Sequence, residues 1–270
     1  MKNSAFSVLM SVYAKEHPVW LEEALNSVFG QTIPPAQVVL VCDGPLTAEL
    51  DAVIDKFKDK ITLVRLAKNG GLGPALNEGL KHCSYDLVAR MDTDDIALPD
   101  RFEKQLKAFG QDKDLSVLGG AIREIDSETK EEVSFRRLPQ SDGEIKQFLK
   151  TRCPFNHMTV MFRKPAVLDC GSYQPLYFME DYYLWARMAA KGYTFGNLAD
   201  IVVNARTDKN LFERRGGWKY FKSNKAVSDK LLELGLISYP TYLFNLAVRF
   251  CVQVLMPNKV RSIFYKKALR

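Results

Sequence analysis

Long apolar runs, internal repeats and low-complexity tracts are all missing from this 270-residue sequence. Its five cysteines are odd in number and scattered, and none forms a CxxC pair. This spacing suggests neither a disulfide framework nor a zinc site. The opening residues MKNS lead straight into the strand-like segment 6–12, without the apolar stretch of a signal peptide. We therefore expect a folded protein of the reducing cytoplasm.

The composition is ordinary for a globular protein, with 47% hydrophobic and 26% charged residues. The length allows one large α/β domain or two small ones. The net charge of +6 is unevenly placed, because residues 214–270 hold 12 Lys or Arg and 2 Asp or Glu, a net +10. A basic tail indicates an anionic partner, although a solvated basic face also fits such a charge run.

Strand and helix patterns alternate through the first hundred residues. The apolar spacing predicts strands over 6–12, 37–43, 61–66 and 85–91, and helices over 18–29, 46–58 and 73–83. Pro18 suits a first helical position and Gly30 suits a helix end. Alternation of this kind predicts a parallel sheet whose ligand lies beyond the carboxyl ends of its strands.

Polar residues follow each of these four strands, so we expect them to meet at one edge of the sheet. They are Tyr13 after the first strand, Asp43 after the second, Asn69, Gly70 and Gly71 after the third, and Asp92, Asp94 and Asp95 after the fourth.

The second hundred residues are more mixed. Strands are predicted over 115–126, 131–138, 157–163 and 194–206, and helices over 141–151 and 178–192. After Gly216 and Gly217 the pattern is helical to the end of the chain.

The three carboxylates at 92, 94 and 95 crowd like charges at the end of an apolar strand. A bound Mg²⁺ or Mn²⁺ would relieve that repulsion, because hard oxygen ligands suit these ions, and phosphate oxygens commonly fill their open positions. The alternative is a solvent-exposed loop that caps the next helix, a role that Asp95 or Asp100 also fits.

Three ordered motifs, VCDG, RMDTDDIALPDR and MEDYYLWARM, resemble those of family 2 glycosyltransferases, which are inverting enzymes that use nucleotide sugars. The resemblance covers about residues 5–205. Within the family, the sequence is similar to bacterial enzymes of O-antigen, capsule and exopolysaccharide assembly. The resemblance implies the α/β GT-A fold, with a Rossmann-like, mostly parallel sheet, helices on both faces and a helical C-terminal extension. It also implies a nucleotide-sugar-binding half over 1–105, an acceptor-binding half over 106–205 and a basic extension over 206–270.

The resemblance places the donor nucleotide on the loops after the first three strands. Tyr13 would stack on uracil, and Asp43 would accept a hydrogen bond from the uracil N3–H. Asp43 also fits an ordinary turn residue. In the stretch NGGLGPALNEG, Asn69 and Gly70 would let the backbone approach the ligand. A glycine-rich turn before Pro74 accounts for the same residues equally well. The stretch is neither a Walker loop nor a GxGxxG motif.

The segment Asp92-Thr93-Asp94 resembles the family's DxD motif. The resemblance makes Asp94 the main ligand of a Mn²⁺ or Mg²⁺ ion. Asp92 would contact ribose or sugar, or reach the metal directly or through water.

Direct displacement at an anomeric carbon needs one base for the acceptor hydroxyl, whereas a glycosidase needs a catalytic pair. The pair Glu180-Asp181 resembles the family's ED motif, with Asp181 as the base and Glu180 orienting the acceptor or the loop. Carboxylates at a helix start also occur for dipole reasons alone.

Three further residues are predicted on the acceptor side. Trp185 would wall the acceptor site or lie in the core, and His157 would approach the donor sugar or be structural. Arg206 resembles a family arginine after the last strand. Many relatives follow it with a histidine, which this chain lacks, so the group that completes the metal or diphosphate site stays open, with Arg214 and Arg215 as candidates.

The apolar stretch 242–256 is interrupted by Asn245, Arg249 and Gln253 and is too short to span a bilayer. With the cations that follow, it predicts a helix lying on an anionic membrane surface, and packing onto the catalytic domain is the alternative. One helical face would hold Leu243, Leu246, Ala247, Phe250, Val254 and Leu255.

The resemblance, together with the basic tail, implies transfer of a hexose or N-acetylhexosamine from a UDP-sugar to a saccharide on undecaprenyl diphosphate, with a β linkage, at the inner face of the cell membrane. We expect no nucleic-acid partner. A sugar nucleotidyltransferase is one alternative, but such an enzyme needs a glycine-rich loop after the first strand, where this chain has SVYAKEHP. A non-catalytic membrane-surface or polyanion-binding protein is another, and it leaves the acidic motifs unexplained.

Overall fold

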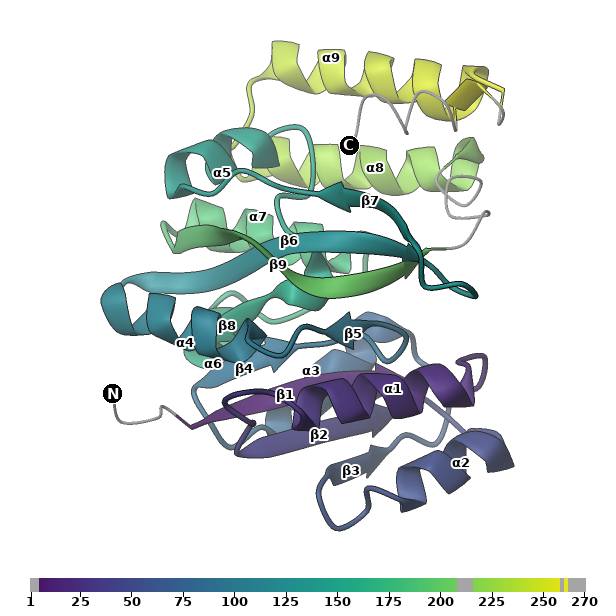
Figure 1. Cartoon of the computed structure of the whole chain (residues 1–270). Helices are drawn as coiled ribbons and strands as arrows, with labels where there is room; N and C mark the ends of the chain where they lie inside the picture. The colour runs from purple at the N-terminus through teal and green to yellow at the C-terminus, as the bar shows by residue number, and fades with distance from the viewer. Residues whose placement is uncertain (1–4, 208–215, 258–259, 262–270) are drawn as a thin grey trace.

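The computed structural model describes residues 5–207, 216–257 and 260–261 (Figure 1). The strands are β1 (Phe6–Val12), β2 (Gln37–Cys42), β3 (Thr62–Arg65), β4 (Leu87–Arg90), β5 (Ile96–Ala97), β6 (Leu115–Asp126), β7 (Glu132–Arg136), β8 (Met161–Arg163) and β9 (Thr194–Thr207). The α-helices are α1 (Pro18–Phe29), α2 (Ala48–Asp55), α3 (Leu72–His82), α4 (Arg101–Gln111), α5 (Asp142–Leu149), α6 (Lys164–Asp169), α7 (Glu180–Ala190), α8 (Gly217–Glu233) and α9 (Tyr239–Phe250). A 3₁₀ turn, η1 (His157–Thr159), and a π-helical turn, η2 (Cys251–Leu255), complete the described elements.

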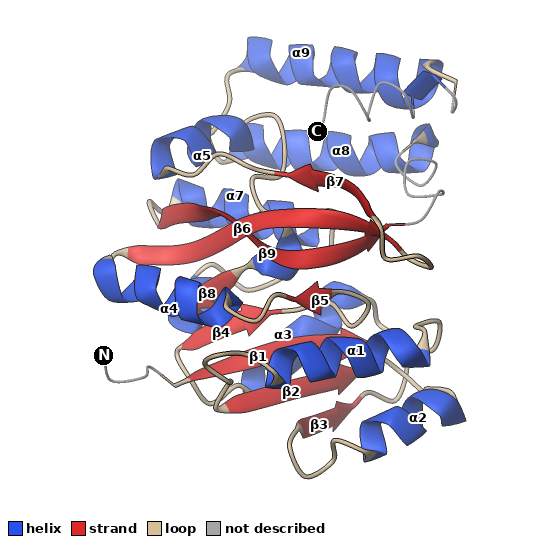
Figure 2. Cartoon of the chain, viewed as in Figure 1, coloured by secondary structure: helices blue, strands red, loops and turns tan. Residues whose placement is uncertain are grey.

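The strands form one mixed sheet in the order β3-β2-β1-β4-β8-β6-β9-β5, with β7 paired to β6 (Figure 2). The first four strands are parallel, as are β6 and β9, whereas β5, β7 and β8 join antiparallel. The predicted α/β fold with a Rossmann-like sheet is therefore confirmed. The carboxyl ends of β1, β2, β3 and β4 lie at one edge, where their loops meet.

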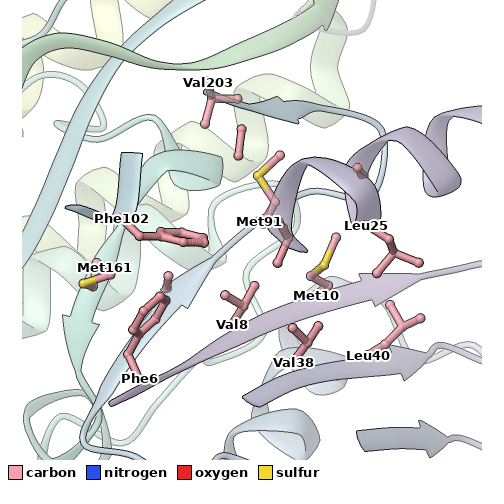
Figure 3. Packing of buried hydrophobic residues seen from close by; sticks show 14 of the residues in the cluster. Phe6, Val8, Met10, Leu25, Val38, Leu40, Met91, Phe102, Met161 and Val203 are labelled. Atoms are coloured by element: carbon pink, nitrogen blue, oxygen red, sulfur yellow. The ribbon is translucent and has the colours of Figure 1, made fainter. Parts of the chain in front are cut away.

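Alternate residues of the central strands face opposite layers of the core, as the two-residue period of a strand requires. Val8 and Met10 of β1 pack with Leu25 of α1 on one side, together with residues of α2 and α4 (Figure 3). Leu9 of β1 and Val41 of β2 face the other side, where α3, α6, α7 and α8 pack. Helices thus cover both faces of the sheet, as predicted.

The segment 157–163 departs from the predicted continuous strand. It begins with the turn η1, whose Thr159 donates both its backbone N–H and its hydroxyl to the carbonyl of Asn156, at 2.9 and 2.8 Å. Only Met161–Arg163 then pair as β8. The prediction of a strand from His157 is wrong because these local bonds close a turn first.

Within the described residues, α8, α9 and η2 form the predicted C-terminal helical extension. Val227 and Leu231 of α8 are fully buried in the core layer that α7 occupies, so α8 is an integral part of the domain. Helix α9 lies over α8 as the outermost layer (Figure 1). No helix in the described residues is long and apolar enough to cross a membrane.

Candidate active site

Asp43 joins the loops that follow β2 and β3. Its Oδ1 accepts a hydrogen bond from Gly70 N at 2.7 Å, and its Oδ2 accepts one from Gly71 N at 2.9 Å. The side chain of Asn69 donates to the Asp43 carbonyl at 3.1 Å. Gly44 has a φ of +87°, and a Cβ there would lie 2.6 Å from Asn69 N, so the two loops touch only because this residue is glycine. Asp43, Asn69 and Gly70 are thus brought together as predicted, in a preformed loop pair.

The acidic loop after β4 gathers three carboxylates. Oxygen atoms of Asp92, Asp94 and Asp95 lie within 4.8 Å of one another. Burial, followed by the charge of Asp92, raises the pKa of Asp94 to about 6. Burial, followed by the charge of Asp94, holds the pKa of Asp95 well above its usual range. Such hard oxygen ligands fit a divalent cation, whose charge would offset the repulsion that raises these pKa values.

Arg206 holds this loop from the end of β9. Its backbone N–H donates to Oδ1 of Asp95 at 2.8 Å, and its guanidinium bonds the carbonyl of Asp94 and the carboxylate of Glu23. The guanidinium carbon also lies 5.5 Å from the centre of the Trp20 ring. Through these bonds Arg206 supports the acidic loop, while its Nε has no hydrogen-bond partner within the described residues.

Glu16 is a fourth carboxylate near the acidic loop, and the sequence analysis missed it. It lies in the loop after β1, three positions beyond Tyr13. Burial, followed by the charges of Asp94 and Asp92, raises its pKa to about 8. Tyr13 itself is 40% exposed on this loop. The sequence could have identified Glu16 as a site residue, because it lies in the same SVYAKE stretch that carries Tyr13.

Arg90 is a second residue that the sequence analysis missed. It is 2% exposed and forms an ion pair with Asp92. Its Nε and Nη1 atoms are buried and have no hydrogen-bond partner within the described part of the chain. A buried guanidinium with unused donors is costly unless a ligand completes its bonds. Its signal was a cation inside the otherwise apolar strand segment YDLVARM.

A cavity of about 350 Å³ joins the acidic loop to the start of α7. Its lining residues are Leu72, Gly73, Leu76, Arg90, Asp92, His157, Tyr173, Phe178, Glu180 and Asp181. The DxD and ED motifs, 86 positions or more apart in the chain, therefore share one cavity.

Asp181 and Glu180 open helix α7 at the cavity wall. Oδ1 of Asp181 accepts a hydrogen bond from Tyr182 N at 2.7 Å, and Oδ2 accepts one from the Cys153 thiol at 3.4 Å. Burial raises the pKa of Asp181 in spite of these two bonds, and burial likewise raises the pKa of Glu180. A buried carboxylate with a raised pKa is suited to taking a proton.

His157 and Trp185 lie differently with respect to the cavity. His157 lines it and shares a hydrogen bond of 2.9 Å with the Tyr173 hydroxyl. Burial, followed by the charge of Arg90, holds the pKa of His157 well below its usual value, so the ring is neutral. Trp185 is fully buried behind His157 and packs edge-on against Phe155, which places it in the core. Arg214 and Arg215 lie outside the described residues.

Comparison with known proteins agrees with this geometry. The family model for glycosyl transferase family 2 matches residues 7–168. An uncharacterized glycosyltransferase of Haemophilus influenzae is 43% identical over 98% of this chain and 99% of its own length. The amylovoran biosynthesis glycosyltransferase AmsE of Erwinia amylovora is 42% identical over 97% of this chain and 98% of its own. The UDP-Gal:alpha-D-GlcNAc-diphosphoundecaprenol beta-1,3-galactosyltransferase of Escherichia coli is 36% identical over 98% and 96%.

Solved structures show the same fold at low identity. S. aureus TarS in complex with UDP-GlcNAc superposes with a TM-score of 0.70 and 19% identity, over 98% of this chain and 76% of that one. The mannosyltransferase PcManGT of Pyrobaculum calidifontis, in complex with GDP-Man and Mn²⁺, gives a TM-score of 0.64 and 15% identity, over 98% and 76%. From the family model and the full-length relatives, we conclude that this chain belongs to glycosyltransferase family 2 and has the GT-A fold.

Proposed function

We propose that the protein is an inverting glycosyltransferase of bacterial surface polysaccharide synthesis. It would transfer a hexose or N-acetylhexosamine from a UDP-sugar to a saccharide on undecaprenyl diphosphate and form a β linkage. The observation that carries this proposal is the single cavity in which Asp92 of the acidic loop faces Asp181 at the start of α7. The Escherichia coli relative is named for transfer from UDP-Gal to GlcNAc on a diphosphoundecaprenol, which supports the donor and acceptor classes.

The donor nucleotide would bind along the loops after β1, β2 and β3. Tyr13 would stack on uracil, and Asp43 would accept from its N3–H with a remaining lone pair, while Asn69 and Gly70 shape the loop. Asp94 and Asp92 would hold Mn²⁺ or Mg²⁺, which when bound supplies positive charge against the leaving diphosphate.

Arg90 adds a fixed cation to the same cavity. Its unused Nε and Nη1 donors fit oxygen atoms of the donor sugar or the diphosphate. Since its remaining N–H group is paired with Asp92, the guanidinium also orients that carboxylate.

Asp181 would take the proton of the acceptor hydroxyl as the sugar is transferred. The bonds from Tyr182 and Cys153 use one lone pair on each of its oxygens and leave others for the acceptor. Glu180 and the neutral His157 line the same wall and would orient the acceptor. The reaction would take place at the inner face of the cell membrane, where a lipid-linked acceptor and a soluble nucleotide sugar can meet.

Calorimetric titration of UDP, with and without Mn²⁺, tests the donor half of this proposal. We expect metal-dependent binding that Asp94→Ala weakens at least tenfold, about 1.4 kcal/mol. Equal binding with and without Mn²⁺ would remove the metal from the site.

Transfer from UDP-Gal and UDP-GlcNAc to GlcNAc on a lipid diphosphate tests the acceptor half. Asp181→Asn should lower kcat by about 10²–10⁴-fold, the usual contribution of a general base, while its UDP affinity stays at the wild-type value. Full activity of Asp181→Asn would contradict its role as the base, and absence of nucleotide binding by the wild type would contradict the transferase proposal as a whole.

A further inference from the structure

Helix α9 and the turn η2 carry their apolar side chains on the outside. The six residues of this outer face, which we call the α9 stripe, are Leu243, Phe244, Ala247, Val248, Cys251 and Leu255, and all are exposed. Phe244 and Leu255 are exposed by 66% and 63%. Successive members are one, three or four positions apart, which places them on one side of the helix. An apolar stripe of this kind normally faces a protein core, and here it faces outward.

Polar side chains on the inner side of the same helix form hydrogen bonds that set the rotation of α9. Asn245 is 5% exposed, and its Nδ2 donates to the Lys150 carbonyl at 2.9 Å. Arg249 donates to the Thr151 carbonyl at 2.7 Å. Turning α9 to bury its stripe would break these bonds at the end of α5, so the outward orientation is built into the fold.

This arrangement corrects the face that the sequence predicted. Leu246, Phe250 and Val254 were expected outside, but they are half-buried. Phe250 packs edge-on against Trp218 and Phe221 of α8, with ring centres 5.8 and 5.6 Å away. Packing onto the domain and exposure of an apolar face therefore occur in one helix, on its opposite sides.

The charge of the sequence segment that carries the stripe indicates what covers it. The last 37 residues of the chain, 234–270, contain no Asp or Glu and six Lys or Arg. An apolar helical stripe within a basic segment that has no acidic residue is the sequence pattern of a helix that lies in an anionic lipid surface. A second copy of the chain fits less well, because pairing through this face would bring two acid-free basic segments together.

A chain of contacts connects α9 to the rim of the cavity. Phe178 lines the cavity, and its ring centre lies 4.2 Å from that of Tyr177. Nζ of Lys219 in α8 lies 3.9 Å from the centre of the Tyr177 ring. The neighbouring Trp218 contacts Phe250 at the end of α9. The exposed helix thus ends a few side chains from the site of transfer.

We infer that the α9 stripe inserts into the interfacial region of an anionic membrane and holds the cavity rim next to the headgroup layer. A saccharide on a lipid diphosphate would then reach Asp181 without leaving the membrane. The membrane contact stands on the helix itself, and only its use for acceptor delivery rests on the proposed function.

Vesicle sedimentation with the full-length protein tests this inference. The vesicles are phosphatidylglycerol mixed with phosphatidylcholine, or phosphatidylcholine alone, and contain no acceptor. We expect at least tenfold stronger partitioning to the anionic vesicles, weakened by added salt. The variant Leu243→Glu/Val248→Glu should lose at least tenfold of this partitioning. The matched control is Leu168→Glu/Val19→Glu, which charges exposed helical positions on α6 and α1 and should partition like the wild type.

Each other outcome overturns the inference. A wild type that does not sediment with anionic vesicles leaves the stripe without a lipid partner. A dimer in solution that Leu243→Glu/Val248→Glu converts to a monomer would assign the stripe to a second copy. Equal losses in the stripe and control variants would mean that general charge, and not the stripe, governs binding. UDP titration of the same samples shows whether the variants fold and separates this result from a failure of the proposed transferase activity.

Discussion

The thiol of Cys153 donates a hydrogen bond to Oδ2 of Asp181 across 3.4 Å. The bond favours the charged form of the carboxylate, whereas burial, the larger effect, disfavours it. Asp181 therefore stands between two opposing influences on its pKa. A base placed in this way is open to adjustment by one neighbouring side chain.

Replacing Cys153 should move the pH dependence of transfer. Cys153→Ala removes a donor to the carboxylate, so the pKa of Asp181 rises and the acid limb of kcat moves to higher pH, by up to about one unit. Cys153→Ser keeps a donor and should move it less. The measurement is kcat against pH for the three proteins, with the KM for the UDP-sugar as control. Coincident profiles for the wild type and Cys153→Ala would contradict the assignment.

Arg206 is expected to matter for the acidic loop without touching a ligand. Arg206→Ala removes the bonds to the Asp94 carbonyl and to Glu23, so the loop loses its support and Mn²⁺-dependent UDP affinity should fall about tenfold, or 1.4 kcal/mol. Arg65→Ala, which removes a more exposed arginine paired with Asp51, is the control and should bind as the wild type does. Unchanged affinity in Arg206→Ala would show that the loop holds its shape alone.

Glu16 predicts a pH-dependent stability of the metal-free protein. Its pKa is about 8 in the folded chain against 4.5 for the ordinary group, so between these values the folded state holds a proton that the unfolded state lacks. Stability therefore falls as pH rises through this window. Glu16→Gln removes this contribution, so its advantage in Tm over the wild type should grow from pH 5.5 to pH 8.5 in EDTA.

The exposed Glu128 provides the control for that experiment. Glu128→Gln should shift Tm by the same small amount at both pH values, since its side chain is in water. A Tm difference between Glu16→Gln and wild type that does not change with pH would mean that Glu16 is not held near the acidic loop.

Asp43 should prove structural as well as functional. Asp43→Ala leaves the N–H groups of Gly70 and Gly71 without their acceptor, and a hydrogen bond of this kind contributes about 0.5–1.5 kcal/mol. We expect a lower free energy of unfolding by denaturant and weaker UDP binding. Asp43→Asn keeps one acceptor oxygen and should fall between. Wild-type stability in both variants would mean that the two loops do not depend on this carboxylate.

The spacing of apolar residues and the positions of Pro and Gly predicted most of the local structure. The boundaries of β1, α1 and β6 agree with the predicted ranges, because buried strands and amphipathic helices impose their periods on a sequence. The gathering of Asp43, Asn69 and the acidic loop followed from the rule that parallel strands end at one edge. β5 was not predicted, because it has only two residues and depends on pairing with β9.

The sequence by itself determined three features of this protein. They are the sheet edge at which the parallel strands end, the acidic loop after β4 and the basic composition of the C-terminal tail. Only the tertiary structure decided that Arg90 pairs with Asp92 in the cavity and keeps unused donors there, that Arg206 supports the acidic loop and that Cys153 reaches Asp181. It also decided which side of α9 faces outward. These outcomes depend on contacts between segments far apart in the chain. A local sequence pattern indicates which face of a helix or strand a side chain lies on, but it does not identify the distant group that forms a hydrogen bond with it.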